Sequence, residues 1–81
     1  MMINIRLFAI LRERAGVSQL TLDLSSGATV GTAKDALLRE YPQLADLMAR
    51  VAFAVNRNYS ALDVELNDGD EVAFLPPVSG G

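Results

Sequence analysis

Two kinds of apolar spacing share this chain of 81 residues, and together they leave few folds open to it. Between residues 30 and 41, apolar side chains recur at intervals of three and four, which is typical of a helix with one buried face. Residues 3–7, 20–24, 51–55 and 71–75 instead alternate every second position, as strands with one buried face do. A domain this small has one core, so we expect the helix to cover a sheet built from these strands.

Turn and capping residues set the boundaries of these segments. Thr29 can cap the main helix, and Pro42 ends it because the residue before a proline disfavours helical geometry. Residues 9–15 have helical composition and predict a short helix or a wide turn, which Gly16 closes. A strong turn signal at residues 67–70 precedes the last strand.

The order strand, strand, helix, strand, strand predicts an α+β fold for residues 1–75. We expect a mixed sheet of four to five strands, covered on one face by the main helix through a right-handed crossover. This is the β-grasp, or ubiquitin-like, arrangement, in which the first and last strands are parallel neighbours. Residues 44–48 are expected to add one helical turn, residues 56–58 form a turn, and residues 59–66 are weakly patterned.

Cysteine and histidine are both missing from the sequence, which excludes several kinds of site. No disulfide, thiolate nucleophile, imidazole base or Cys/His zinc site can form, and we expect no bound metal. The chain carries 7 basic and 10 acidic residues, and its net charge of −3 disfavours nucleic-acid binding. Hydrophobic residues make up 51% of the chain, as in a folded globular domain.

The charge is distributed unevenly along the chain. Residues 1–57 contain all seven basic residues and have a net charge of +2, whereas residues 58–81 contain five acidic residues, no basic one and a net charge of −5. This acidic third is either a surface for a basic partner or a solvated turn region, and the sequence leaves both open. No apolar run reaches the roughly 20 residues of a membrane span, and no signal-peptide pattern opens the chain. We therefore expect a cytoplasmic protein that binds no membrane.

The last six residues have a composition of their own. The proline pair cannot continue a ladder inside a sheet and favours extended geometry, so it should end the last strand and direct the chain away from the body. The two final glycines offer a backbone without side chains, which fits a narrow channel in another protein. A frayed end is the alternative. We expect a flexible C-terminal tail made of Pro76, Pro77, Val78, Ser79, Gly80 and Gly81.

A candidate partner surface follows from the strand alternation. Phe8 and Leu75 have the opposite parity to the apolar residues expected to face the helix, so both should lie on the other face of the sheet. They should also lie close together, because the first and last strands are expected to be neighbours. An exposed apolar pair of this kind is typical of a partner interface, which Tyr59 can extend and Arg12 can flank. The alternatives are that loops cover the apolar residues and that Arg12 is simply solvated.

Several stretches of the sequence resemble the family of small, ubiquitin-like sulfur-carrier subunits of molybdopterin synthases. The ending DGDEVAFLPPVSGG over residues 68–81 carries most of the resemblance, with IRLFA at 5–9, LRE at 11–13 and AVN at 54–56. Length and element order match over the whole chain. The ending PPVSGG is the specific part, because the thiamine-pathway sulfur carrier shares the fold and the Gly-Gly but usually lacks the proline pair.

The resemblance implies a chemistry centred on Gly81. A ubiquitin-activating-like adenylyltransferase joins the terminal carboxylate to AMP, and a sulfur donor converts it to a thiocarboxylate. The large subunit of molybdopterin synthase, in a heterotetramer, then receives the tail and uses the sulfur on cyclic pyranopterin monophosphate for molybdenum-cofactor biosynthesis. The chain is thus implied to be a non-catalytic sulfur-donating subunit that binds no cofactor, while ATP is used by the activating enzyme. A sulfur carrier of another pathway, a ubiquitin-like protein modifier and a plain binding module remain as alternatives.

Overall fold

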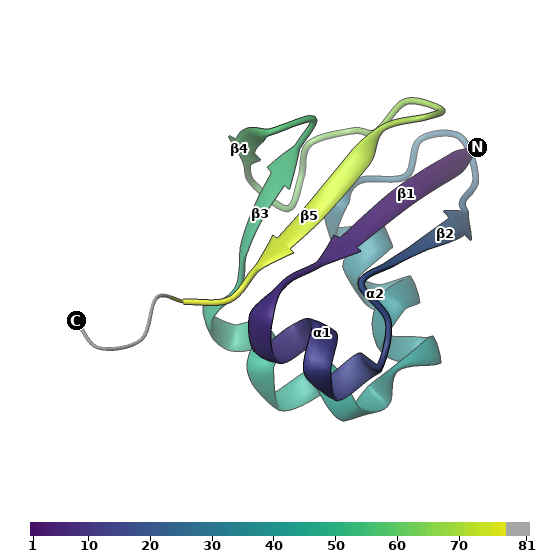
Figure 1. The fold of residues 1–81 in the computed structure, drawn as a ribbon. Helices are drawn as coiled ribbons and strands as arrows, with labels where there is room; N and C mark the ends of the chain where they lie inside the picture. The colour runs from purple at the N-terminus through teal and green to yellow at the C-terminus, as the bar shows by residue number, and fades with distance from the viewer. Residues whose placement is uncertain (78–81) are drawn as a thin grey trace.

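The computed structural model describes residues 1–77 of the chain. Within them lie five strands and three helical segments, arranged with the helices packed on one side of a twisted sheet (Figure 1). The third helical segment is a 3₁₀ helix. In chain order the elements are β1 (Met2–Leu7), α1 (Ala9–Ala15), β2 (Gln19–Asp23), α2 (Val30–Glu40), η1 (Pro42–Arg50), β3 (Ala52–Val55), β4 (Asn58–Ser60) and β5 (Glu71–Leu75).

The five strands form one mixed sheet in the order β2-β1-β5-β3-β4. β1 and β5 are parallel, with Leu7 opposite Phe74, and the other neighbouring pairs are antiparallel. The β-grasp prediction is therefore confirmed, including the pairing of the first and last strands. β5 lies at the centre of the sheet, so the chain leaves the body from its middle rather than from an edge.

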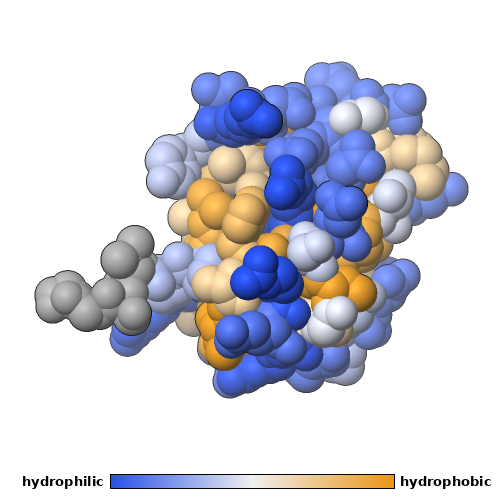
Figure 2. All heavy atoms as spheres, viewed as in Figure 1, coloured by the Kyte–Doolittle hydropathy of each residue, from blue (hydrophilic) through white to orange (hydrophobic). Residues whose placement is uncertain are grey.

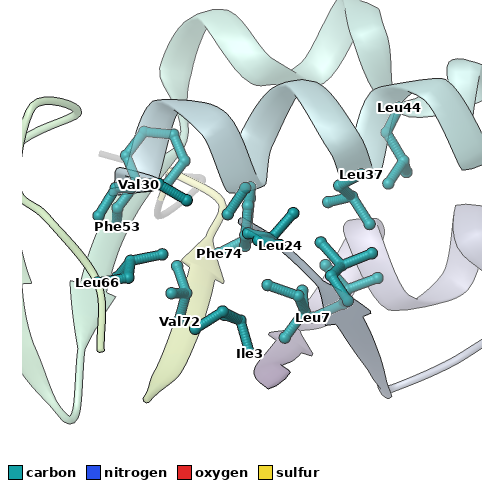
Figure 3. Packing of buried hydrophobic residues seen from close by; sticks show 14 of the residues in the cluster. Ile3, Leu7, Leu24, Val30, Leu37, Leu44, Phe53, Leu66, Val72 and Phe74 are labelled. Carbon is teal, nitrogen blue, oxygen red and sulfur yellow. The ribbon is translucent and has the colours of Figure 1, made fainter. Parts of the chain in front are cut away.

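The core lies between the sheet and α2. Every second residue of β1 is buried, as the alternation predicted, and α2 contributes three fully buried side chains at helical spacing (Figure 3). Phe53 and Phe74 meet edge to face with ring centroids 5.1 Å apart, a favoured aromatic geometry. The largest of the fully buried side chains are Phe74, Ile3, Ile5, Leu7, Leu11, Leu37, Leu44, Val30 and Val72.

The predicted capping residues terminate the helices as expected. Thr29 accepts a hydrogen bond from the backbone N–H of Thr32, whose own side chain accepts one from the backbone of Thr29. Gly16 closes α1 in the left-handed region, at φ +83°, where residues with a Cβ are strained. α2 ends at Glu40, just before Pro42. The wide-turn alternative for residues 9–15 is excluded, since they form a helix.

Two segments differ from the sequence-based expectation. The expected single turn at residues 44–48 is part of a nine-residue 3₁₀ helix, η1, which packs on α1 and α2. Residues 58–60 form the short edge strand β4, although Asn58 was expected to lie in a turn and the following residues had little pattern. The turn itself consists of Asn56 and Arg57, at φ +49° and +73°, which joins β3 and β4 into a hairpin.

The end of the described chain continues directly from the central strand. Pro76 and Pro77 follow β5, and we call this pair the stem. The expected flexibility of the tail concerns chiefly residues 78–81, which lie outside the described residues. In the described part of the chain, no helix has the length and apolar character needed to cross a bilayer.

Candidate partner-binding face and tail stem

Within residues 1–77, no helix lies on the face of the sheet opposite α2, and we call this face the open face. Viewed from this side, apolar residues gather toward the end of the sheet at which the chain leaves it, beside a band of hydrophilic residues (Figure 2). Phe8 and Leu75 are partly exposed, whereas their neighbours Leu7 and Phe74 are buried. Tyr59 extends from β4 with 82% of its surface exposed. Large aromatic side chains this exposed are typical of partner contacts rather than of folding contacts.

Two adjoining grooves bring these three residues together. One, of about 380 Å³, has Ala54 and Ala73 among its lining residues, so small side chains leave room on the sheet. The other, of about 670 Å³, runs toward Pro76 and Pro77 and is lined mainly by apolar surface. Phe8, Tyr59 and Leu75 line both grooves. The parity argument therefore located the apolar patch, and the grooves connect that patch to the stem.

Arginines surround the open face. The guanidinium of Arg6 lies 5.4 Å from the centroid of the Phe8 ring and 3.8 Å from the carboxylate of Glu71, which positions it over the apolar surface. Arg57 lines the first groove and Arg50 lines the second. Arg12 is exposed on α1 and is not among the residues that line either groove. A partner with acidic side chains around an apolar centre would fit this face.

The hairpin that carries Tyr59 is fixed by the side chain of Asn56. Its Nδ2 donates to Asp70 at 2.9 Å, and its Oδ1 accepts the backbone N–H of Glu71 at 3.0 Å. The backbone N–H of Asn56 also donates to the carbonyl of Glu71 at 2.9 Å. Three hydrogen bonds thus hold the β3–β4 turn against the start of β5, and Tyr59 is presented on a constrained hairpin.

The acidic residues before β5 serve the turn. Asp68 accepts the backbone N–H of Met2 at 2.6 Å, and Asp70 accepts that of Asn67 at 2.7 Å as well as the Asn56 amide. Gly69 turns the chain at φ +86°. Of the two explanations for the acidic C-terminal third, the structure therefore supports a turn-forming role for Asp68 and Asp70 rather than a contact with a basic partner.

Sequence reasoning missed three of the arginines on this face. Arg6 shares the parity of Phe8, so the alternation that placed Phe8 could have placed Arg6 as well. Arg50 is the last residue of the 3₁₀ helix η1, and Arg57 lies in the turn between β3 and β4. Neither residue belongs to a periodic pattern that would indicate which way its side chain points. Of the predicted tail, Pro76 and Pro77 lie beside the second groove, and Val78, Ser79, Gly80 and Gly81 fall outside the described residues.

Comparisons with known proteins agree with the fold and extend over nearly the whole chain. The model of the ThiS family matches residues 5–81. The molybdopterin synthase sulfur carrier subunit of Chlamydomonas reinhardtii is 41% identical over 83 residues, covering 100% of both chains. The structure of SAMP1 from Haloferax volcanii matches with a TM-score of 0.92 and 35% identity, covering 100% of both. A complex of subunits 1 and 2 of molybdopterin-converting factor from Helicobacter pylori contains a chain that matches with a TM-score of 0.73 and 27% identity, again covering 100% of both.

A β-grasp sheet with one open apolar face and a stem leaving its central strand defines a small ubiquitin-like protein. The family match includes the C-terminal residues beyond the stem, so it extends past the part that the structure describes. The chain belongs to the ThiS family.

Proposed function

We propose that this chain carries sulfur in molybdenum-cofactor biosynthesis, as the small subunit of a molybdopterin synthase. The observation that carries the proposal is the position of the stem, which leaves the central strand beside an apolar open face. This arrangement lets a partner bind the open face of the domain while the tail enters a channel of that partner. Full-length identity of 41% to a molybdopterin synthase sulfur carrier subunit supports the same role.

The reacting group is the carboxylate of Gly81, the last residue of the sequence. A carboxylate resists nucleophiles, so activation comes first. Its oxygen attacks the α-phosphorus of ATP, pyrophosphate leaves, and a mixed anhydride with AMP results. Sulfur at the sulfide level then attacks the carbonyl carbon and AMP leaves, which gives the thiocarboxylate. In the synthase, the thiocarboxylate sulfur bonds to a carbon of cyclic pyranopterin monophosphate while an oxygen substituent leaves that carbon. Water then attacks the acyl carbon of the resulting thioester, the C–S bond to Gly81 breaks, and the sulfur stays on the pterin while the carboxylate is restored.

The chain supplies the carried atom, and its partners supply the acids, bases and phosphate-binding groups. Two partners are proposed: a ubiquitin-activating-like adenylyltransferase, which uses the ATP, and the large subunit, with which the chain forms a heterotetramer. The Helicobacter pylori complex of subunits 1 and 2 supports a second subunit as partner. All steps take place in the cytoplasm, and the chain itself binds no cofactor. Phe8, Leu75 and Tyr59 provide the apolar centre of the contact, and Arg12, which lines neither groove, is proposed to pair with an acidic residue of the partner outside this centre.

Intact-mass spectrometry tests the carrier function directly. The chain incubated with the adenylyltransferase, ATP and a sulfide source should gain the mass difference between sulfur and oxygen. The loaded chain plus the large subunit should then convert the pterin precursor. Deleting Gly81 should abolish loading and leave the Tm nearly unchanged, because terminal residues generally contribute little to stability. Loading of the Gly81 deletion would rule out the carrier function.

A second candidate is a protein modifier, favoured by the TM-score of 0.92 to SAMP1, a small archaeal modifier protein. In that case the activated Gly81 would form an amide with a lysine of a target protein. Mass spectrometry of cell extracts separates the two functions. A sulfur-for-oxygen exchange on the free chain indicates a carrier, and target lysines joined by an amide bond to the C-terminal peptide of this chain indicate a modifier.

A further inference from the structure

A third groove lies on the other side of the stem from the open face. It has a volume of about 310 Å³ and lies between α1 and η1, so we call it the α1–η1 groove. Pro76, Pro77 and Arg50 line both this groove and the larger groove of the open face. The stem is therefore flanked by a depression on each side. The remaining lining residues are Ile10, Asp46, Leu47 and Ala49.

Ile10 does not fit the pattern of its own helix. α1 buries Leu11, and its other long side chains, Arg12, Glu13 and Arg14, are exposed as expected for a surface helix. Ile10 is also 40% exposed, although its side chain is apolar. A single exposed aliphatic residue is ordinary. Ile10 differs because it lines a concave surface together with Leu47 and the two prolines of the stem.

The length of the tail dictates what must lie over this groove. Four residues follow Pro77, and at 3.3–3.6 Å per residue they reach at most about 14 Å. Any protein that takes Gly81 into a channel must therefore bring the mouth of that channel up to the stem. A mouth surrounds what enters it, so its rim meets both sides of the stem and not the open face alone.

We propose that the α1–η1 groove is a second docking surface for the partner that receives the tail. The rim of the channel places an apolar side chain against Ile10 and Leu47 and a carboxylate opposite Arg50. Arg50 forms no ion pair within residues 1–77, whereas Asp46, the acid beside it, is paired with Arg14 at 2.7 Å. The groove thus presents an apolar floor with one uncompensated positive charge. The inference rests on the proposed function, since it requires a tail-receiving partner.

Binding of the full chain to the large subunit of molybdopterin synthase tests the proposal. Ile10→Ser should raise the Kd about tenfold, as truncation of a well-packed anchor residue at an interface does. Arg50→Glu should raise it at least as much, with a loss that shrinks at high salt because the charge lies at the rim. Leu62→Ser is the matched control for Ile10, since Leu62 is 43% exposed and lines none of the three grooves. Arg39→Glu on α2 is the control for Arg50.

The outcomes separate this inference from the function on which it rests. If the wild-type chain binds and both variants stay within twofold of it, the groove is not a docking surface and the sulfur-carrier function is unaffected. If the wild-type chain does not bind the large subunit, the proposed function fails, and this inference with it. Thermal melting identifies a loss due to misfolding in Ile10→Ser. Ala49→Trp, at an exposed residue that lines this groove and neither groove of the open face, should then block docking and raise the Kd, and an unchanged Kd would overturn the proposal.

Two other occupants of the groove would also overturn the proposal. If Ile10→Ser changes the sedimentation of the chain alone, a second copy fills the groove. If deleting residues 78–81 shifts the methyl resonances of Ile10 in the free chain, its own tail does so.

Discussion

Phe74 and Leu75 are adjacent in β5 and have similar polarity, but they face opposite sides of the sheet. Phe74 is fully buried against Phe53 beneath α2, and Leu75 lines both grooves of the open face. The difference follows from the two-residue period of a strand alone. One residue is buried in the core and its neighbour lies on the proposed partner surface, which gives a sharp test of the open face.

Alanine substitutions at these neighbours should have opposite effects. Phe74→Ala should lower the free energy of unfolding by about 3–5 kcal/mol, the usual cost of a cavity where an aromatic ring was buried. Leu75→Ala should cost less than half of that, and should weaken binding to the large subunit by about 2 kcal/mol or more. Urea unfolding and calorimetric titration measure the two quantities. Phe8→Ala is the companion variant and should behave as Leu75→Ala does. The reverse pattern at 74 and 75 would show that the open face is not the partner surface.

At the scale of elements, periodic segments could be predicted from the sequence and short ones could not. The strands β1, β2, β3 and β5 and the helix α2 have repeating apolar positions, and all were predicted close to their observed bounds. β4 spans three residues, too few to show a period, and its hairpin turn lacks glycine although both turn residues have positive φ. Tertiary hydrogen bonds from Asn56 hold that turn, and a local pattern does not reveal them.

α1 and η1 are joined by an ion pair that makes a pH-dependent contribution to stability. Arg14 donates to Asp46 at 2.7 Å, and this hydrogen bond, with the charge of the guanidinium, lowers the pKa of the Asp46 carboxyl below its usual value. A lowered pKa in the folded state stabilises the protein above the pKa of the unfolded chain, about 3.9. That contribution disappears as the pH falls through the lower folded value.

Arg14→Gln should therefore lower the Tm slightly at pH 7, since exposed pairs contribute little. The difference from the wild-type chain should vanish at acid pH, once Asp46 is protonated in both. Melting curves between pH 2 and pH 7 measure this difference. Arg12→Gln on the same helix is the control, because Arg12 has no ion pair within residues 1–77. A difference that persists unchanged at pH 2 would indicate that Arg14 stabilises the fold through packing instead.

At the scale of the whole molecule, the body and the tail are expected to differ in mobility. Ordering a residue costs roughly 1–2 kcal/mol, and the Gly-Gly end has no side chains with which to offset that cost. Amide relaxation should give low order parameters after Val78 in the free chain and higher ones in the complex with the large subunit. Residues 71–75 in the central strand serve as the internal rigid reference. High order parameters at the tail of the free chain would contradict this prediction.

The candidate site could be predicted in part because two of its features are local. The parity of Phe8 and Leu75 and the composition of the stem can be read directly from the sequence. The arginines around the open face and the α1–η1 groove could not be predicted. Their positions depend on where the β3–β4 turn and the end of the 3₁₀ helix lie in the folded chain. Sequence periodicity indicates which face of a strand or helix is buried. A docking site also depends on how turns and helix ends pack against one another.

The central position of β5 has a consequence for how the molecule is made. Of all the elements, β5 is the last to leave the ribosome, yet β1 and β3 pair with each other only through it. A nascent chain that lacks it holds two separate hairpins with unpaired edges, and such species are prone to degradation and aggregation. A chain interrupted before residue 75 therefore cannot complete the sheet. Because β5 is the last element of the described residues, chains interrupted before it would not fold, and few stable fragments of the domain would arise.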